Sequence, residues 1–250
     1  MIHPNNPSAK PRSGPPTVSV IMPVKNSARF LAEALSSLRE QTCRDFEIIV
    51  IDGRSSDDTA AVVRDSVGRD DRPLRYLIQA GDGLADARNT GIEAARGRLI
   101  AFLDGDDRWD PAKLELQVER LSADPSLQYC LGWVRFFLES GTRPRPGFSP
   151  DMFERGQTGL TPGALLARRE LFHTLGGFDP ALAIGCDSDW FARASDRKIQ
   201  MAVVPEALLL KRIHGENLSA RADLYRREML TVLRQSVLRK RRSGRNHADA

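Results

Sequence analysis

Three carboxylates crowd into one short turn of this 250-residue chain. The segment 102–107 reads FLDGDD, so an apolar run ends in Asp104, Asp106 and Asp107. Two explanations fit these residues. An Asp-Gly-Asp-Asp segment standing alone is usually a solvated turn, but carboxylate oxygens are also the ligands that Mg²⁺ and Mn²⁺ prefer. The elements that position the turn help to decide between the two explanations.

Strands and helices alternate through the first half of the chain. Nearly continuous apolar strands are predicted at 17–24, 46–53 and from 98 into the acidic turn, and a weaker strand is predicted at 74–80. Helical segments begin near positions 27, 55, 83 and 111. Buried strands separated by amphipathic helices are typical of a parallel sheet that helices cover on both faces.

Local signals predict where these helices begin and end. Asn26 or Ser27 is predicted to cap the first helix. Acidic residues are expected in the first turn of the second helix, where the helix dipole favours them. Gly97 is predicted to close the third helix.

Polar clusters follow three of the predicted strands. They read PVKN at 23–26, DGRSSDD at 52–58 and DGDD at 104–107. Right-handed crossovers bring the carboxyl ends of parallel strands to one edge of the sheet, where open α/β sheets bind ligands. The sequence therefore predicts one site at this edge, built from residues that are far apart in the chain.

The pattern changes after position 125. Residues 127–139 are predicted to be β structure, and the Pro-, Gly- and Arg-rich stretch 140–157 is predicted to be a mobile loop. A last helix is expected at 223–239. The residues predicted to form its apolar side are Leu224, Met229, Leu230, Leu233 and Val237.

Composition sets limits on the class of protein. Hydrophobic residues make up 41% and charged residues 28%, as in globular domains, and the net charge of +4 owes much to the tail RKRRSGRNH. The three cysteines, Cys43, Cys130 and Cys186, are widely spaced, which argues against a disulfide framework or zinc knuckle and favours a reducing cytoplasm. No apolar run is long enough to span a membrane, and the N-terminus does not resemble a signal peptide.

The order of the motifs resembles that of family 2 glycosyltransferases of the GT-A fold. The motifs are VSVIMPVKN, DFEIIVIDGRSSDDT, GLADARNTGIEAARGRLIAFLDGDDRWDPAKL and GGFDPAL, with looser similarity in CDSDWFARA and RIHGENLS. The resemblance implies a Rossmann-like, mostly parallel α/β sheet with helices on both faces, a smaller acceptor-side region and a C-terminal helix. It divides the chain into a disordered lead-in (1–16), a nucleotide-sugar half (17–124), an acceptor half (125–220) and a C-terminal helix with a basic tail (221–250).

The resemblance also implies a metal-dependent, inverting transferase. Asp106 would bind Mn²⁺ or Mg²⁺ directly, Asp104 would assist near the ribose or the metal waters, and Asp107 would stand behind them. His214, in a stretch close to the family's His-x-x-x-x-Ser pattern with Ser219, would complete the metal site, unless it is a structural histidine.

Nucleotide contacts are expected from the first two polar clusters. Asp52 would accept a hydrogen bond from uracil N3–H, or else stabilise the turn before Gly53. The base would lie against Pro23 and Val24. Other contacts to the donor are expected from Lys25, which stands where many relatives have tyrosine, and from Asn26, Ser55 and Gly105; a solvated Lys25 and a capping Ser55 are the alternatives.

The segment 83–89 adds further candidate donor contacts. Gly83 permits a loop close to the ligand, and Arg88 and Asn89 match the family's Ala-Arg-Asn motif. Arg88 would face the diphosphate with its donor fork or form an ion pair with an aspartate of the acidic turn, and both roles are compatible.

The general base is expected from CDSDWFAR. Asp187 aligns with the family's aspartate and Asp189 is the second candidate, although both also stand where they could cap a helix. Cys186 replaces the usual glutamate, which raises the alternative of a covalent nucleophile.

Two other functions compete with a UDP-sugar transferase. One is a GT-A module that binds nucleotide-sugar but has lost catalysis, and the other is a sugar nucleotidyltransferase, although PVKNSARF lacks the glycine-rich loop typical of that class. The acceptor remains open among saccharides, lipid carriers, metabolites and peptides. No specific nucleic-acid contact is expected. The C-terminal helix is expected to be available for the inner face of a membrane or for another subunit.

Overall fold

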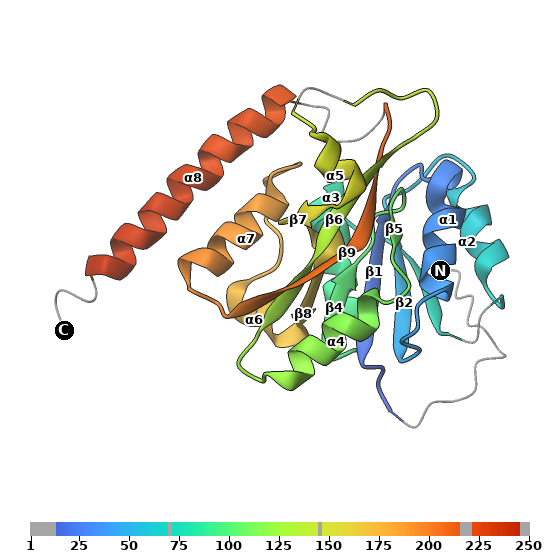
Figure 1. The fold of residues 1–250 in the computed structure, drawn as a ribbon, viewed down its shortest axis with the longest axis horizontal. Coiled ribbons are helices and arrows are strands. Elements are labelled where there is room, and N and C mark those ends of the chain that lie inside the picture. The colour runs from blue at the N-terminus through green and yellow to red at the C-terminus, as the bar shows by residue number, and fades with distance from the viewer. Residues whose placement is uncertain (1–13, 70–71, 145–146, 216–221, 246–250) are drawn as a thin grey trace.

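The computed structural model describes residues 14–69, 72–144, 147–215 and 222–245 (Figure 1). Most of the predicted disordered lead-in, Ser219 and the end of the basic tail lie outside these residues. Side chains in α8 are described from 223 to 241.

The nine described strands form a single sheet, with the order β3-β2-β1-β4-β8-β6-β9-β5 and β7 paired to β6. The first four of these neighbours pair in parallel. The other half is mixed, because β8, β5 and β7 run antiparallel to their neighbours while β6 and β9 are parallel. The strand bounds are β1 Val18–Val24, β2 Phe46–Asp52, β3 Leu74–Ile78, β4 Leu99–Phe102, β5 Arg108–Trp109, β6 Tyr129–Leu138, β7 Gln157–Thr158, β8 Leu165–Arg168 and β9 Met201–Ile213.

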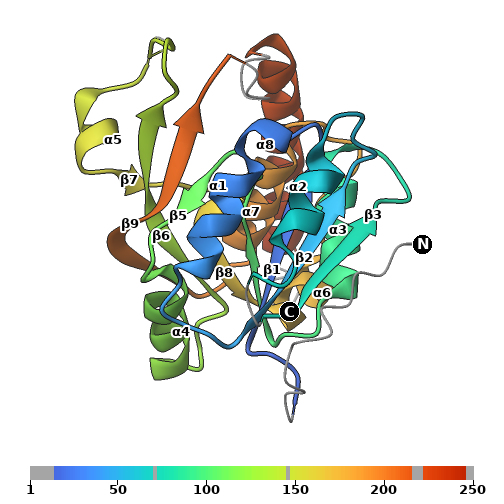
Figure 2. The same cartoon turned by 90° about the vertical axis from the view of Figure 1, so that its right-hand side faces the viewer.

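Helices cover both faces of the sheet, as predicted. On one face lie α1 (Ala28–Arg39), α2 (Thr59–Ser66) and α4 (Lys113–Ala123) (Figure 2). The other face carries α3 (Gly83–Ala94), α6 (Arg169–Leu175) and α7 (Cys186–Asp196), and α8 (Ala222–Arg245) packs against α7 (Figure 1). The predicted loop 140–157 contains a short helix, α5 (Pro150–Glu154), and η1 (Pro162–Ala164) is a 3₁₀ turn.

The start of α1 agrees with the prediction only in position. Ser27 is the N-cap residue, but its side chain makes no cap hydrogen bond, and the carboxylate of Asp57 accepts the Ala28 backbone N–H at 3.0 Å. Asn26 is occupied with the Ser56 backbone N–H, at 2.9 Å. The loops after β1 and β2 thus hold each other, which places both at the carboxyl edge of the sheet.

The second and third helices also depart from their predicted ends. The helix α2 begins at Thr59, so Asp57 and Asp58 precede its first turn. The helix α3 ends at Ala94, before Gly97. Gly97 serves close packing instead, because a Cβ there would lie 2.6 Å from the backbone nitrogen of Ser19.

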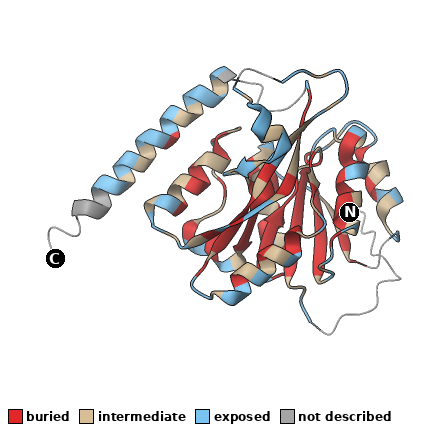
Figure 3. Ribbon diagram, viewed as in Figure 1, coloured by how far each residue is buried: buried red, intermediate tan, exposed pale blue. Residues whose placement is uncertain are grey.

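The core is formed by the strands and the inward faces of the helices, coloured red in Figure 3. The predicted apolar side of α8 faces mostly outward. Leu230 and Leu233 are 64% and 61% exposed, whereas Val232 is 3% exposed. The helix is held to α7 by polar groups as well, since Ser236 and Arg239 both bind Asp196, and these contacts orient its face.

Candidate active site

The acidic turn follows β4 at the carboxyl edge of the sheet. Carboxylate oxygens of Asp104, Asp106 and Asp107 lie within 4.8 Å of one another. The side chains of Asp104 and Asp106 are 23% and 28% exposed, whereas that of Asp107 is 1% exposed. A simple solvated turn would expose all three, so the turn is a built structure with two acids facing outward.

Asp107 anchors the turn to β9. Its carboxylate accepts the backbone N–H of Arg212 at 2.8 Å and the ammonium of Lys211 at 3.0 Å. Burial raises the pKa of Asp107 to about 7, against the opposing effect of Lys211. Asp107 therefore stands behind the outward pair, as the resemblance implied.

Arg212 supports the acidic turn from the protein interior, and it was not predicted from the sequence. The side chain is buried, and its Nε donates to the backbone oxygen of Asp106 at 2.9 Å. Its two terminal nitrogens pair with Glu33 at 2.7 Å and Glu139 at 2.6 Å. These partners come from α1 and from the residue after β6, so no local sequence signal could identify the group.

His214 lies beside the expected metal ligand. Its Nε2 is 2.9 Å from Oδ2 of Asp106, and its ring packs against Phe30 with centroids 4.9 Å apart. An imidazole nitrogen and carboxylate oxygens together form a donor set that suits Mn²⁺ or Mg²⁺. The structure thus brings together the residues that the resemblance assigned to the metal.

Lys211 is a second group that sequence reasoning missed. Its Nζ lies 3.6 Å from the carboxylate of Asp104 as well as 3.0 Å from that of Asp107. Burial lowers the pKa of Lys211, but the two aspartates outweigh it and raise the pKa above its ordinary value. A fixed positive charge therefore balances part of the negative charge of the turn.

Arg88 connects the acidic turn to α7. It is 1% exposed, lies 3.3 Å from Asp104 and donates a short hydrogen bond to Asp187. Burial lowers the pKa of Arg88, but Asp187 and Asp104 raise it above its ordinary value. The ion-pair alternative is thus observed, and it brings the first candidate base next to the turn.

The other two chemical candidates in α7 are buried. Asp189 is 2% exposed and pairs with Arg193 at 2.7 Å and Arg239 at 3.5 Å, and these contacts give no support to its role as an alternative base. Cys186 is fully buried, and burial raises its thiol pKa to about 12. A protonated thiol in the core is a poor nucleophile, which argues against the covalent alternative.

The start of α7 is held by a carboxylate from α8. Glu228 accepts the backbone N–H groups of Ala183, Ile184 and Gly185, at 2.9, 3.0 and 2.6 Å. This contact orients the first turn of α7, which carries Asp187. It joins residues more than forty positions apart, and no motif indicated it.

Asp52 lies at the end of β2 with its carboxylate largely enclosed. It is 2% exposed and accepts the Ser55 backbone N–H and hydroxyl at 2.8 and 2.7 Å, and also the Tyr76 hydroxyl. Burial and the bond to Asp52 raise the pKa of Tyr76 above its ordinary value. The backbone N–H of Asn26 adds a further hydrogen bond to this group, because it donates to the Ser55 hydroxyl at 2.8 Å.

The other residues predicted to contact the donor lie at the end of β1, in the acidic turn and at the start of α3. A Cβ added at Gly105 would lie 3.1 Å from Val24 and from Ser27, so the turn packs closely against the end of β1. There Pro23 is buried and Lys25 is exposed. Elsewhere, Gly83 is the first residue of α3.

Asn89 has a structural partner. Its amide donates to the backbone oxygen of Phe178 and accepts the Phe178 backbone N–H, both at 2.8 Å. The side chain therefore pins the segment before α7 to α3, and this pairing gives no support to a role at the nucleotide.

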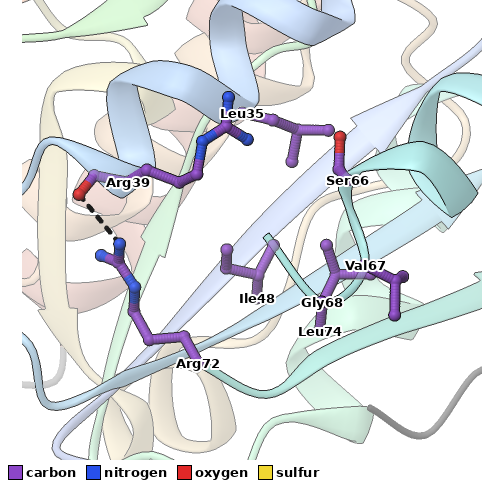
Figure 4. Close-up of a pocket in the computed structure, with 8 residues that line it drawn as sticks. All are labelled: Leu35, Arg39, Ile48, Ser66, Val67, Gly68, Arg72 and Leu74. Carbon is purple, nitrogen blue, oxygen red and sulfur yellow. Dashed lines mark hydrogen bonds between the residues drawn. The ribbon is translucent and has the colours of Figure 1, made fainter. Parts of the chain in front are cut away.

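Two cavities differ sharply in character. One of about 320 Å³ adjoins the acidic turn through Lys211 and Arg212 and is walled by Phe136, Phe148 and Leu160. The other holds only about 20 Å³, room for a single water, between α1, α2 and the strands β2 and β3 (Figure 4). Its lining includes none of the described residues that contact the acidic turn, whereas the larger cavity shares Lys211 and Arg212 with the turn, so the larger cavity is the one that adjoins the site.

Comparison with known proteins places this geometry in a family. The sequence profile of glycosyl transferase family 2 matches residues 19–185. The chain belongs to that family. The uncharacterized glycosyltransferase EpsJ of Bacillus subtilis is 46% identical over 92 residues, covering 37% of the chain and 26% of EpsJ. Chondroitin synthase of Pasteurella multocida is 26% identical over 240 residues, covering 94% of the chain and 24% of that enzyme.

Solved structures show that this member of the family has the GT-A fold. S. aureus TarS 1-349 in complex with UDP-GlcNAc is similar with a TM-score of 0.71 and 21% identity, covering 89% of the chain and 66% of TarS 1-349. The mannosyltransferase PcManGT from Pyrobaculum calidifontis, in complex with GDP-Man and Mn²⁺, gives 0.69 and 23%, covering 90% and 65%. The predicted family and fold are therefore confirmed.

Proposed function

We propose that the chain is an inverting, metal-dependent glycosyltransferase that moves a sugar from a UDP-sugar to a hydroxyl acceptor. The observation that carries this proposal is the Arg88 bridge, which links Asp104 of the acidic turn to Asp187 of α7. A transferase needs a charged group at the leaving diphosphate and a separate base at the acceptor. One buried guanidinium holds both groups in a fixed relation.

The leaving-group side consists of Asp106, Asp104 and His214. Their outward carboxylates and adjacent imidazole fit Mn²⁺ or Mg²⁺, and PcManGT was crystallised with Mn²⁺ and GDP-Man. When bound, the metal would neutralise charge on the departing diphosphate as a Lewis acid. Asp107 and Arg212 keep the two ligands in place.

Asp187 acts as the general base. It removes the proton from the acceptor hydroxyl while the hydroxyl oxygen bonds to the anomeric carbon. The bond from that carbon to the diphosphate oxygen breaks on the opposite face, and the electron pair leaves with the diphosphate. Arg88 orients the carboxylate, and the 24% exposure of the Asp187 side chain leaves it accessible.

The uracil ring of the donor is bound by Asp52 and the end of β1. A carboxylate has about four lone-pair positions, and the described donors from Ser55 and Tyr76 use three. The remaining position accepts uracil N3–H, with Pro23 and Val24 beside the base and Lys25, Asn26 or Gly105 nearer the phosphates. UDP-GlcNAc in the similar TarS structure is consistent with this choice.

The acceptor enters through the cavity beside Lys211. Its aromatic wall, from Phe136 and Phe148, suits the C–H face of a sugar or another apolar surface. The chain spans only about a quarter of the length of EpsJ and chondroitin synthase, and their names do not identify its acceptor.

The test measures UDP release from a panel of UDP-sugars with Mn²⁺, in the presence of candidate acceptors. D187N should lower kcat by about 10²- to 10⁴-fold and keep Mn²⁺-dependent thermal stabilisation by UDP. D65N, at an exposed aspartate of α2, is the matched control. D106N should lose the Mn²⁺-dependent stabilisation itself.

Two outcomes would contradict the proposal. Full turnover by D187N would remove Asp187 as the base. Donor binding without release or transfer by the unmodified chain would favour the alternative of a nucleotide-sugar-binding module.

A further inference from the structure

The outward face of α8 carries an apolar stripe. Leu230, Leu233 and Val237 are 64%, 61% and 49% exposed. Their spacing of three and four residues places them on one side of the helix. Figure 3 shows this helix lying along the edge of the body with much of its surface exposed.

The body of the protein already occupies the opposite side of α8. Val232 is buried, Glu228 binds the start of α7, and Ser236 and Arg239 bind Asp196. Rotation of the helix to bury the apolar stripe would break all of these contacts. The stripe is therefore a fixed outward surface of the folded protein.

Basic residues flank the stripe. Arg226, Arg227, Arg234 and Arg241 are all exposed, and Asp223 is the one exposed acid between 223 and 241. Exposed leucine and valine side chains set among arginines form the pattern of a helix that lies in a bilayer interface. Arginine contributes through attraction to anionic headgroups, and the apolar side chains enter the acyl boundary.

A second copy of the chain fits this surface less well. Antiparallel pairing of two α8 helices would place these arginines opposite one another, with only Asp223 from each copy to offset them. We propose that α8 docks the protein on a bilayer surface rich in anionic lipid. The helix lies flat on this surface, and none of the described helices is long and apolar enough to cross a membrane.

Vesicle co-sedimentation of the full chain tests the proposal. Vesicles of phosphatidylcholine alone are compared with vesicles that also contain phosphatidylglycerol, at low and high salt. We expect binding to the anionic vesicles only, and weaker binding at high salt because counterions screen the arginines. Binding to neither kind of vesicle, or equal binding to both, would overturn the proposal.

Matched substitutions separate the stripe from general effects. L233S should weaken binding by about tenfold, whereas I78S, at a 54% exposed isoleucine of β3, should not. The double variant R234Q/R241Q should weaken it by about 30-fold, and R64Q/R69Q, at exposed arginines elsewhere, should have little effect.

Folding and association are measured on the same variants. Each should unfold at the temperature of the unmodified chain, since all the changed side chains are exposed. Light scattering distinguishes a bilayer surface from a second copy of the chain as the partner of the stripe. A concentration-dependent dimer that L233S abolishes, together with unchanged vesicle binding, would assign the stripe to a second copy and overturn the membrane proposal.

Discussion

Lys113 is a buried cation outside the candidate site. It is fully buried in α4, donates to Gln117 at 2.6 Å, and lies 4.1 Å from the centre of the Trp109 ring. No ion pair joins it to a carboxylate among the described residues. Burial lowers its pKa from 10.5 to about 7.

The lowered pKa makes folding dependent on pH. Between about pH 7 and 10.5 the unfolded chain holds a proton on this lysine that the folded chain releases, so stability rises with pH across that window. At pH 7 the shift corresponds to a destabilisation of about 4 kcal/mol, which shrinks to about 1 kcal/mol at pH 10.

We predict that K113M stabilises the protein at neutral pH. Methionine fills about the same volume without a charge. Loss of the contact with the Trp109 ring and of the hydrogen bond to Gln117 costs about 2 kcal/mol, which offsets part of the gain from removing the charge. The expected net gain is about 2 kcal/mol at pH 7. The difference in unfolding free energy between the variant and the unmodified chain should fall by about 3 kcal/mol on going to pH 10.

Urea unfolding at the two pH values measures this difference. K198M, at an exposed lysine, is the matched control and should give the same small difference at both. Subtracting the curves removes every other titrating group that the two chains share. A K113M difference independent of pH would show that the buried lysine stays charged, and the reasoning from burial would be refuted.

Three further predictions concern the site. E228Q should lower kcat with little change in the KM for the donor, because the start of α7 loses the carboxylate that holds it while the acidic turn stays intact. Steady-state kinetics in which donor binding weakens as much as kcat falls would contradict this prediction. C186A should keep its turnover, and a thiol reagent should modify the half-buried Cys43 before Cys186; inactivation by C186A would revive a chemical role. R212M should unfold about 3 kcal/mol more easily and bind Mn²⁺ about tenfold more weakly, since Glu33 and Glu139 each lose one of their cations and the turn loses its support. An unchanged Mn²⁺ affinity by calorimetry would contradict that role.

Local patterns were sufficient to predict the parallel half of the sheet. Most of its strands are nearly continuous apolar runs followed by turn residues, and strand ends in such a sheet share an edge. Asp52 and Asp104 could therefore be placed on one side of the molecule from the sequence. The residues that hold them could not be predicted, because Tyr76, Lys211 and Arg212 meet their partners only through the tertiary fold.

Helix faces were predicted less well where polar contacts determine packing. The apolar spacing in α8 placed Leu230, Leu233 and Val237 on one side of the helix, and this side faces outward rather than towards the core. The observed inner side contains Glu228 and Arg239, whose hydrogen bonds to α7 and its preceding loop orient the helix. Asp189 shows the same effect, since its match to a catalytic pattern hid a structural ion pair with Arg193.

The partners of the three acids in the turn favour one of them as the principal metal ligand. Asp107 is bonded to Lys211 and to the backbone of Arg212, and Asp104 lies between Arg88 and Lys211. Ammonium and guanidinium groups can only donate, so they compete with a metal for the same oxygens. Asp106 lies against His214, and an imidazole nitrogen can itself bind a metal. A divalent ion would therefore gain two ligands at the Asp106–His214 edge, and it would have to share Asp104 with the cations that hold it.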